Sequence, residues 1–184
     1  IDGFGTPEQY IKRAVELGQK NIGLTDHGNV SGHFKWYKAA TKAGIKPILG
    51  CEMYTTDSYE NKDPEDKYHH ITVLALNNKG YKNLLKLVTK SWQEGFYFKP
   101  RITYDDLEAN QEGLLFTSGC PSGKSGKMFK NGINEKKIIE QLKEFSKKFE
   151  NFYLELSPWS YDEGQEYFEF VLKAHKITKI PLVD

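Results

Sequence analysis

The sequence has little that would indicate a membrane protein, a disulfide-rich protein or a strongly charged one. Its two cysteines, Cys51 and Cys120, cannot form a disulfide framework, so we expect a reducing compartment, the cytoplasm. No apolar run approaches the roughly 18 residues of a membrane span, and we expect no membrane partner. The 26 Lys and Arg residues nearly balance the 25 Asp and Glu residues. This balance excludes a strongly basic arm as the main feature of the protein.

Several common sequence signals are also missing. The N-terminal segment IDGFGTPEQY has no initiator Met and no signal-peptide pattern, so we expect a piece of a longer protein. Neither GxGxxG nor GxxxxGK[ST] occurs, so no motif indicates dinucleotide or P-loop binding. The length of 184 residues corresponds to about one domain.

What the sequence does contain is an alternation of strand and helix patterns. Thr6 to Gln9 (TPEQ) is typical of a helix start, with Thr6 as N-cap and Gln9 completing a capping box. Short apolar strands are expected at 21–28, 46–56, 70–76, 113–120, 151–157 and 179–184. Helices are expected before and between them, the longest beginning after Asn134. The alternation predicts an α/β fold of parallel strands covered by helices, either an open sheet or a barrel.

Side chains with catalytic potential gather where the expected strands end. These are Asp26 and His27 after IGLT, Glu52 after ILGC and Cys120 after LLFTSG. In parallel α/β folds the carboxyl ends of the strands carry the active site. Carboxylate, imidazole and thiolate groups are metal ligands, and such a set suits metal-activated hydrolysis. Each residue alone is more often an ordinary polar side chain than a metal ligand, and His69 and His70 stand at the start of a strand instead.

Two basic segments could contact phosphate. In 122–130, SGKSGKMFK, backbone N–H groups together with Lys124 and Lys127 are candidates. In 92–101, Lys99 and Arg101 stand among four aromatic residues, a composition typical of a single-strand binding platform. Ordinary surface loops have the same composition, so both alternatives stay open. We assign Cys51 to core packing.

Ordered blocks of the sequence resemble one protein family. The blocks are LTDHGNVSGHFKWYKAATKAGIKPILGCEMY and HHITVLALNNKGYKNLLKLV, followed by GLLFTSGC, FYLEL and IPLV. They resemble the polymerase-and-histidinol-phosphatase (PHP) domain at the N-terminus of bacterial and phage C-family DNA polymerase III alpha subunits. The resemblance covers residues 1–184 as a single domain. It implies a distorted (β/α)7 TIM-like barrel that is incomplete at both ends.

The resemblance also implies a metal site. Its ligands would be Asp2, His27, Glu52, His70 and Cys120, holding up to three divalent ions of Zn, Mn or Mg. His70 is preferred to His69 because the family histidine directly precedes the apolar strand. Asp26 would orient its neighbours, so the expected catalytic residues are Asp26, His27 and Glu52. The family's first His-x-His motif and last Asp-x-His motif are absent from the chain.

Three functions are compatible with this resemblance. The first is a metal-dependent 3′–5′ exonuclease acting on a DNA primer end, with the rest of the polymerase chain and other replisome proteins as partners. The second is a non-catalytic scaffold within the polymerase, which the missing motifs favour. The third is a stand-alone phosphatase such as histidinol-phosphate phosphatase. The polymerase's own catalytic aspartates lie outside this chain in the family, so the resemblance implies no DNA synthesis by this segment.

Overall fold

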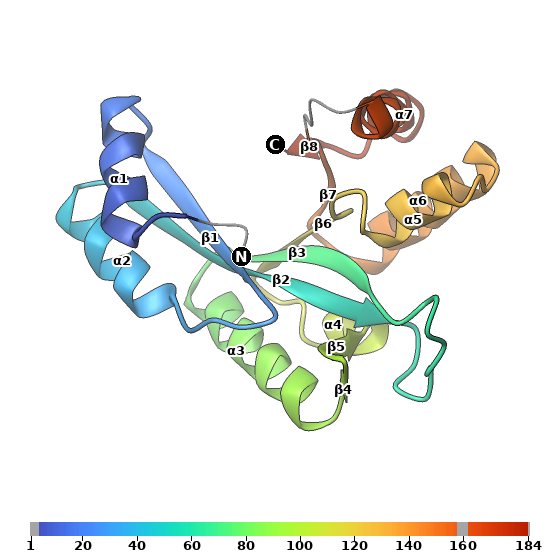
Figure 1. Ribbon diagram of the computed structural model, residues 1–184, viewed down its shortest axis with the longest axis horizontal. Coiled ribbons are helices and arrows are strands. Elements are labelled where there is room, and N and C mark those ends of the chain that lie inside the picture. Colours follow the sequence, from blue (N-terminus) through green and yellow to red (C-terminus); the bar gives the residue numbers. More distant parts are fainter. Residues whose placement is uncertain (1–3, 158–161, 184) are drawn as a thin grey trace.

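The computed structural model describes residues 4–157 and 162–183, which form an α/β fold (Figure 1). The helices are α1 (Pro7–Glu16), α2 (His33–Lys42), α3 (Asn78–Gln93), α4 (Tyr104–Ala109), α5 (Lys124–Lys130), α6 (Glu135–Lys148) and α7 (Asp162–Thr178). The strands are β1 (Asn21–His27), β2 (Lys46–Thr56), β3 (His69–Ala75), β4 (Phe96–Tyr97), β5 (Lys99–Thr103), β6 (Leu114–Thr117), β7 (Phe152–Glu155) and β8 (Leu182–Val183).

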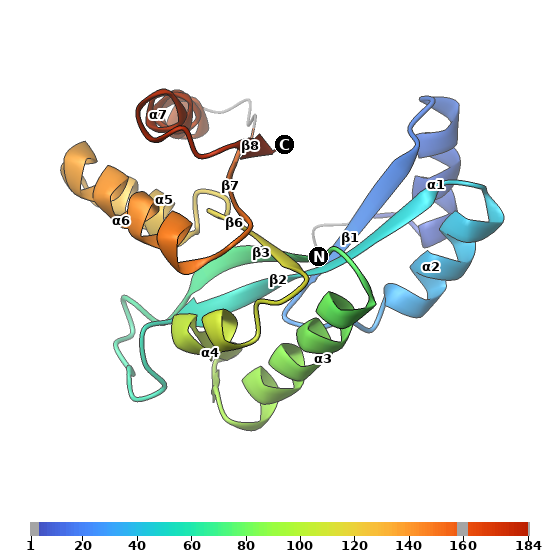
Figure 2. The same cartoon turned by 180° about the vertical axis from the view of Figure 1, so that it is seen from behind.

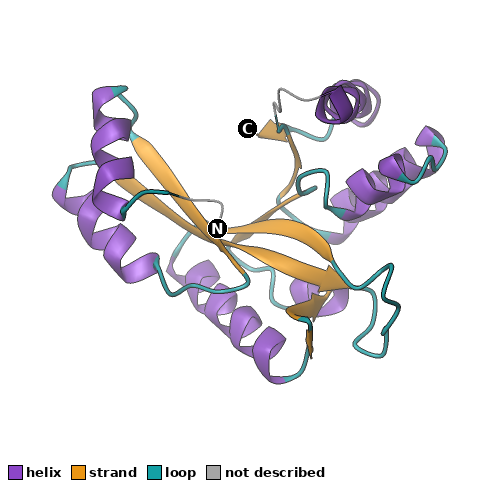
Figure 3. Cartoon of the chain, viewed as in Figure 1, coloured by secondary structure: helices purple, strands orange, loops and turns teal. Residues whose placement is uncertain are grey.

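One curled, mixed sheet connects all these strands. Its order is β4-β5-β2-β3-β6-β7-β8, and β1 pairs with β2. Within the described residues β1 pairs only with β2 and β8 only with β7, so the sheet is open between them. Figure 3 shows the helices lying around the outside of the curled strands. The arrangement is a distorted TIM-like fold, as the sequence resemblance implied.

The expectation of an all-parallel sheet is wrong for β3. This strand runs antiparallel to both of its neighbours, β2 and β6, whereas β1, β2 and β5 run parallel, as do β6, β7 and β8. The connection from β2 to β3 is the polar segment 57–68, which contains no helix. Without a crossover helix the chain can return directly alongside β2, and antiparallel pairing results.

Two groups of buried apolar side chains hold the fold together. The smaller one packs α1 and α2 against β1 and β2 and is centred on Ile11, Trp36 and Ala40. The larger one lies under α3, α4, α6 and α7 and includes Phe116 and Phe149, whose rings stack with centroids 4.5 Å apart. Seen from behind, α3 and α4 cover one side of β2 and β3 (Figure 2). The other side of these strands is left for polar residues.

The predicted helix starts agree with the structure. Thr6 caps α1 with the predicted capping box, Thr103 caps α4 and Asn134 caps α6. The sequence patterns missed the short β4 and β5 strands, and helix α5 lies in the segment expected to be a basic loop. In the part of the chain that the structure describes, no helix is long and apolar enough to cross a membrane.

Candidate metal centre

The candidate ligands converge on Glu52, which lies inside the 11-residue strand β2. In the sheet register His27 of β1 lies beside Glu52, and Thr72 of β3 lies on its other side. Side chains of paired residues point to the same face of a sheet, so this pairing brings His27 and Glu52 together. The register thus brings these two predicted residues together, although Glu52 lies inside β2 rather than at its end.

Four side chains form a connected cluster around Glu52. Its Oε1 atom lies 3.0 Å from Nδ1 of His27 and 2.7 Å from Nδ1 of His70. The Sγ atom of Cys120 lies 3.8 Å from the same His70 nitrogen. We refer to His27, Glu52, His70 and Cys120 as the ligand cluster. It contains two imidazoles, a carboxylate and a thiol, contributed by three strands and one loop.

The antiparallel direction of β3 explains how His70 reaches this cluster. Parallel strands present their carboxyl ends to the site, but His70 stands near the start of its strand. Because β3 runs against β2 and β6, its start lies where those strands end, and Tyr54 pairs with His70 in the register. The position of His70, anomalous in an all-parallel sheet, is thus the expected one in this sheet.

A tight loop brings Cys120 to the cluster. Gly119 has φ of 76°, and a Cβ there would lie 2.4 Å from the carbonyl oxygen of His70. The backbone N–H of His70 donates to the carbonyl of Ser122 at 3.1 Å. Glycine is needed at this close approach because any side chain would push the loop away from β3. The loop is therefore tied to the strand that carries His70.

Aromatic rings enclose His70. Tyr68 stacks on it with centroids 6.0 Å apart and an interplanar angle of 7°, and Tyr54 meets it edge-on at 5.3 Å. The ammonium group of Lys127 donates to the backbone carbonyl of Tyr68. These contacts restrict the orientation of the imidazole toward Glu52 and Cys120.

Contacts within the cluster also shift the pKa values of His70 and Glu52. Burial opposes protonation of His70, but hydrogen bonds to Cys120 and Glu52 and the charge of Glu52 outweigh it and raise its pKa to about 9. Burial alone would raise the pKa of Glu52, yet hydrogen bonding to His70 and the charge of both histidines lower it. Glu52 and His70 therefore form an ion pair in the absence of a bound metal.

The remaining predicted residues lie outside the cluster. Asp26 precedes His27 in β1, so its side chain points to the opposite face, and its Oδ2 accepts from the Gly32 N–H at 3.3 Å. His69 likewise points away from His70, and its Nε2 lies 3.0 Å from Oδ1 of Asp66. Burial lowers the pKa of His69 to about 4. Asp2 lies outside the described residues.

Cys51 is fully buried, as predicted for a core residue. Burial raises the pKa of its thiol to about 12, so it remains protonated at neutral pH. His33 and His175 are also structural, since each bonds a backbone carbonyl, of Gly50 and Ile180 respectively.

Sequence reasoning missed Glu155. Its Oε2 accepts hydrogen bonds from Thr72 at 3.0 Å and Thr117 at 2.6 Å, and Thr72 is the neighbour of Glu52 in the register. A carboxylate in the strand pattern FYLEL, between two apolar residues, was the available signal. Glu155 therefore extends the polar surface of the sheet beyond the ligand cluster.

In the two basic segments, Lys124 and Arg101 do not have the phosphate-binding roles expected of them. Lys124 pairs with Asp57 at 2.6 Å, so its charge is already neutralised. Arg101 is fully buried, and its guanidinium donates to four backbone carbonyls, those of Tyr59, Asn61, Lys67 and Gly95. The prediction that Arg101 is part of an exposed platform is therefore wrong, because its donors stabilise the 57–68 segment from inside.

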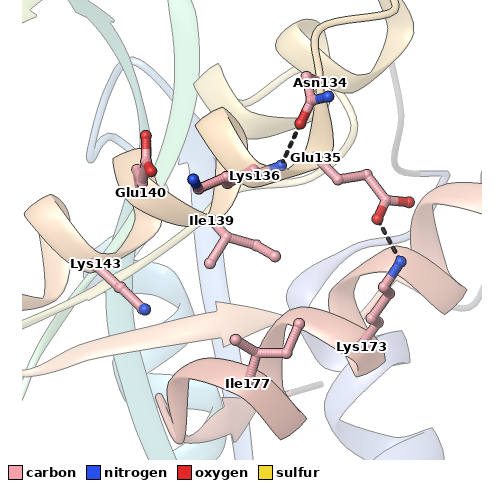
Figure 4. A pocket seen from close by; sticks show the side chains of 8 residues that line it. All are labelled: Asn134, Glu135, Lys136, Ile139, Glu140, Lys143, Lys173 and Ile177. Carbon is pink, nitrogen blue, oxygen red and sulfur yellow. Dashed lines mark hydrogen bonds and ion pairs between the residues drawn. The ribbon is translucent and has the colours of Figure 1, made fainter.

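The surface grooves give little indication of an alternative site. One of about 590 Å³ lies between α6 and α7 and is lined by Ile139, Ile177 and charged side chains, with Lys173 paired to Glu135 (Figure 4). It carries none of the candidate residues. A second groove, of about 700 Å³, runs along β1 and reaches Asp26 and His27. Of these two grooves, the second contains a residue of the ligand cluster, His27.

The donor chemistry of the ligand cluster fits a divalent transition metal. Imidazole, carboxylate and thiolate together suit Zn²⁺ and related ions. Across residues 4–157 and 162–183 no three His, Cys, Asp or Glu side chains are spaced as a finished metal cage. Instead the donors bond directly to one another, with Glu52 bridging both histidines. A metal would have to replace these hydrogen bonds.

The chain thus combines a TIM-like α/β sheet with a cluster of imidazole, carboxylate and thiol side chains. The PHP domain family model matches residues 1–158. The chain therefore belongs to the PHP domain family.

Known proteins support this assignment. The chain is 42% identical over 167 residues to the DNA polymerase III subunit alpha of Aquifex aeolicus, a match that covers 85% of the chain. It is 40% identical over 188 residues to that of Borreliella burgdorferi, covering 99% of the chain. The chain spans only 14% and 16% of the lengths of these relatives.

The fold has a solved counterpart. A metal-dependent phosphoesterase structure from Bifidobacterium adolescentis superposes with a TM-score of 0.58, covering 97% of this chain and 80% of that one. The sequence identity is 13%, so this likeness concerns the fold.

Proposed function

We propose that this chain is a PHP domain of a replicative DNA polymerase III alpha subunit and that its ligand cluster hydrolyses phosphodiesters at a DNA 3′ end. The observation that carries the proposal is the convergence of His27, Glu52, His70 and Cys120 at one edge of the sheet. The identity to the polymerase relatives supports DNA as the substrate and the rest of a polymerase chain as the partner.

Each residue of the cluster would have a defined part. His27, Glu52, His70 and Cys120, with Asp2 as a further ligand, would hold divalent ions of Zn, Mn or Mg. Such ions orient the phosphate oxygens and lower the pKa of a bound water. Before a metal binds, Glu52 bonds both histidines and thereby holds the ring of each toward the site. Tyr68 and Tyr54 hold His70 from two sides and limit its movement.

One observation favours a second candidate, a non-catalytic scaffold. The donors in the cluster satisfy one another, and the Glu52–His70 ion pair needs no metal to be stable. In that case the cluster would stabilise the strand ends while the domain supports the polymerase and its partners.

Degradation of a 3′-labelled primer separates the two candidates. The protein is incubated with the primer in Mn²⁺ or Zn²⁺, beside Glu52→Ala, His27→Ala and the control Glu112→Ala, which removes only a surface ion pair with Lys79. Hydrolysis predicts loss of labelled nucleotide that requires metal, Glu52 and His27. Absent activity, or activity unchanged by Glu52→Ala, would contradict the catalytic proposal and support the scaffold.

A further inference from the structure

Three large aromatic rings lie exposed in the segment 92–98. Trp92, at the end of α3, is 51% exposed, Phe96 is 56% exposed and Phe98 is 63% exposed. Phe98 also has φ of 59°, a left-handed conformation that costs free energy for a residue other than glycine. The chain thus holds an aromatic ring in solvent in a strained backbone conformation.

Two of the rings, Trp92 and Phe96, form a stack next to Gly28, whereas Phe98 meets the ring of Tyr97 edge-on with centroids 4.7 Å apart. Trp92 and Phe96 lie nearly parallel, with centroids 5.7 Å apart and an interplanar angle of 27°. The indole N–H of Trp92 donates to the carbonyl of Gly28 at 2.8 Å. Gly28 directly follows His27, so this hydrogen bond fixes the stack at the border of the ligand cluster.

Two lysines accompany the rings. The ammonium of Lys67 lies 4.6 Å from the ring centre of Phe98, and that of Lys99 lies 5.4 Å from the ring centre of Tyr54. Tyr54 in turn meets His70 edge-on at 5.3 Å. In the described ranges neither lysine forms a salt bridge, so both charges remain available to an anion. We call Trp92, Phe96, Phe98, Lys67 and Lys99 the aromatic platform.

We propose that the aromatic platform binds single-stranded DNA, with bases stacking on its rings and its lysines contacting the phosphates, beside the ligand cluster. Exposed rings with interleaved cations are the combination that binds single strands without sequence preference. A protein partner is disfavoured because lysine is depleted from the cores of protein interfaces. The role of the bound strand as substrate rests on the proposed function, whereas the binding itself does not.

The test measures binding of a fluorescent oligodeoxythymidine of about 12 nucleotides, within the usual site size. Anisotropy titrations are carried out in EDTA, so that hydrolysis cannot contribute. The variant Lys67→Ala/Phe98→Ala removes one ring and its cation. The matched control, Phe34→Ala/Lys38→Ala, removes a ring that is 72% exposed and a lysine 5.3 Å from its centre, both on α2.

The platform predicts that Lys67→Ala/Phe98→Ala weakens binding by at least about fivefold, the contribution of one stacked base. The control should bind as the unchanged protein does. Lys99→Gln should reduce the slope of log K against log salt by about 0.7, the loss of one single-strand phosphate contact. Equal affinity of all variants, or equal weakening by the control, overturns the proposal.

A small substrate separates this inference from the proposed function. Bis(p-nitrophenyl) phosphate with Mn²⁺ tests the ligand cluster alone, because it is too small to need several stacked rings. Retained hydrolysis by Lys67→Ala/Phe98→Ala, together with weakened oligonucleotide binding, supports the platform. If the unchanged protein hydrolyses nothing, the proposed function fails. The titrations in EDTA still show whether the aromatic platform binds DNA.

Discussion

Nδ1 of His70 lies 2.7 Å from Oε1 of Glu52, although the two residues belong to strands that run in opposite directions. This contact depends on the reversed strand β3, which carries His70 to the edge where β2 ends. The same nitrogen faces the thiol of Cys120 at 3.8 Å. One imidazole therefore connects the strand pair to the loop that follows β6.

The Glu52–His70 contact predicts a measurable change in titration. In Glu52→Gln the negative charge is lost, so the pKa of His70 should fall from about 9 toward its ordinary value of 6.5. Proton NMR of the His70 ring in EDTA measures this pKa. Glu112→Gln, which alters a surface pair with Lys79, is the control and should leave it unchanged. An unchanged pKa in Glu52→Gln would show that the ion pair is absent in solution.

The burial of Arg101 predicts that its substitution lowers the stability of the protein rather than its affinity for DNA. Lysine cannot reach the four carbonyls that the buried guanidinium bonds, so Arg101→Lys should lower the free energy of unfolding by about 3 kcal/mol. Urea unfolding measures the loss. Arg13→Lys, at an exposed ion pair with Glu16, is the matched control and should change stability by less than about 0.5 kcal/mol. Equal effects at the two positions would contradict the role assigned to Arg101.

Gly80 gives a case in which packing should outweigh helix propensity. Gly80 is the third residue of α3, and alanine is a better helix former than glycine by at most about 1 kcal/mol. However, a Cβ at Gly80 would lie 1.8 Å from the carbonyl oxygen of Gly113, so the helix must move away from the sheet. We expect Gly80→Ala to destabilise the protein by about 1–3 kcal/mol.

The comparison for this prediction is Lys86→Ala, at an exposed position of the same helix. It should change the unfolding free energy by less than about 0.5 kcal/mol. Thermal denaturation of both variants measures the difference. A stabilised Gly80→Ala variant would mean that α3 and the turn at Gly113 are farther apart in solution.

Much of the local structure was predictable from sequence because its causes are local. The capping box of Thr6 and Gln9 fixes the start of α1, and β2 spans Lys46–Thr56 as the apolar pattern predicted. Glu52 and His27 lie side by side because β1 and β2 are parallel, as the strand-helix alternation predicted. That both side chains can bind a metal follows from the residue types, which the sequence shows directly.

The rest depends on contacts between distant segments. The helix-free segment 57–68 allows β3 to reverse direction, but nothing in the sequence pairs His70 with Cys120, which is 50 residues away. Arg101 has the composition of an exposed basic segment, and its burial follows from how 57–68 folds over it. Glu155 was missed because its partners, Thr72 and Thr117, come from other strands.

Cobalt substitution tests most directly whether the ligand cluster is a metal centre. Co²⁺ bound to a thiolate gives a charge-transfer absorption band, and Cys120 is the only thiol in the cluster, whereas Cys51 is buried with a pKa of about 12. We predict that Co²⁺ produces this band in the unchanged protein and in Cys51→Ser, and that Cys120→Ser and Glu52→Ala lose it. No band in the unchanged protein, or a band that persists in Cys120→Ser, would contradict the assignment of this cluster as the metal site.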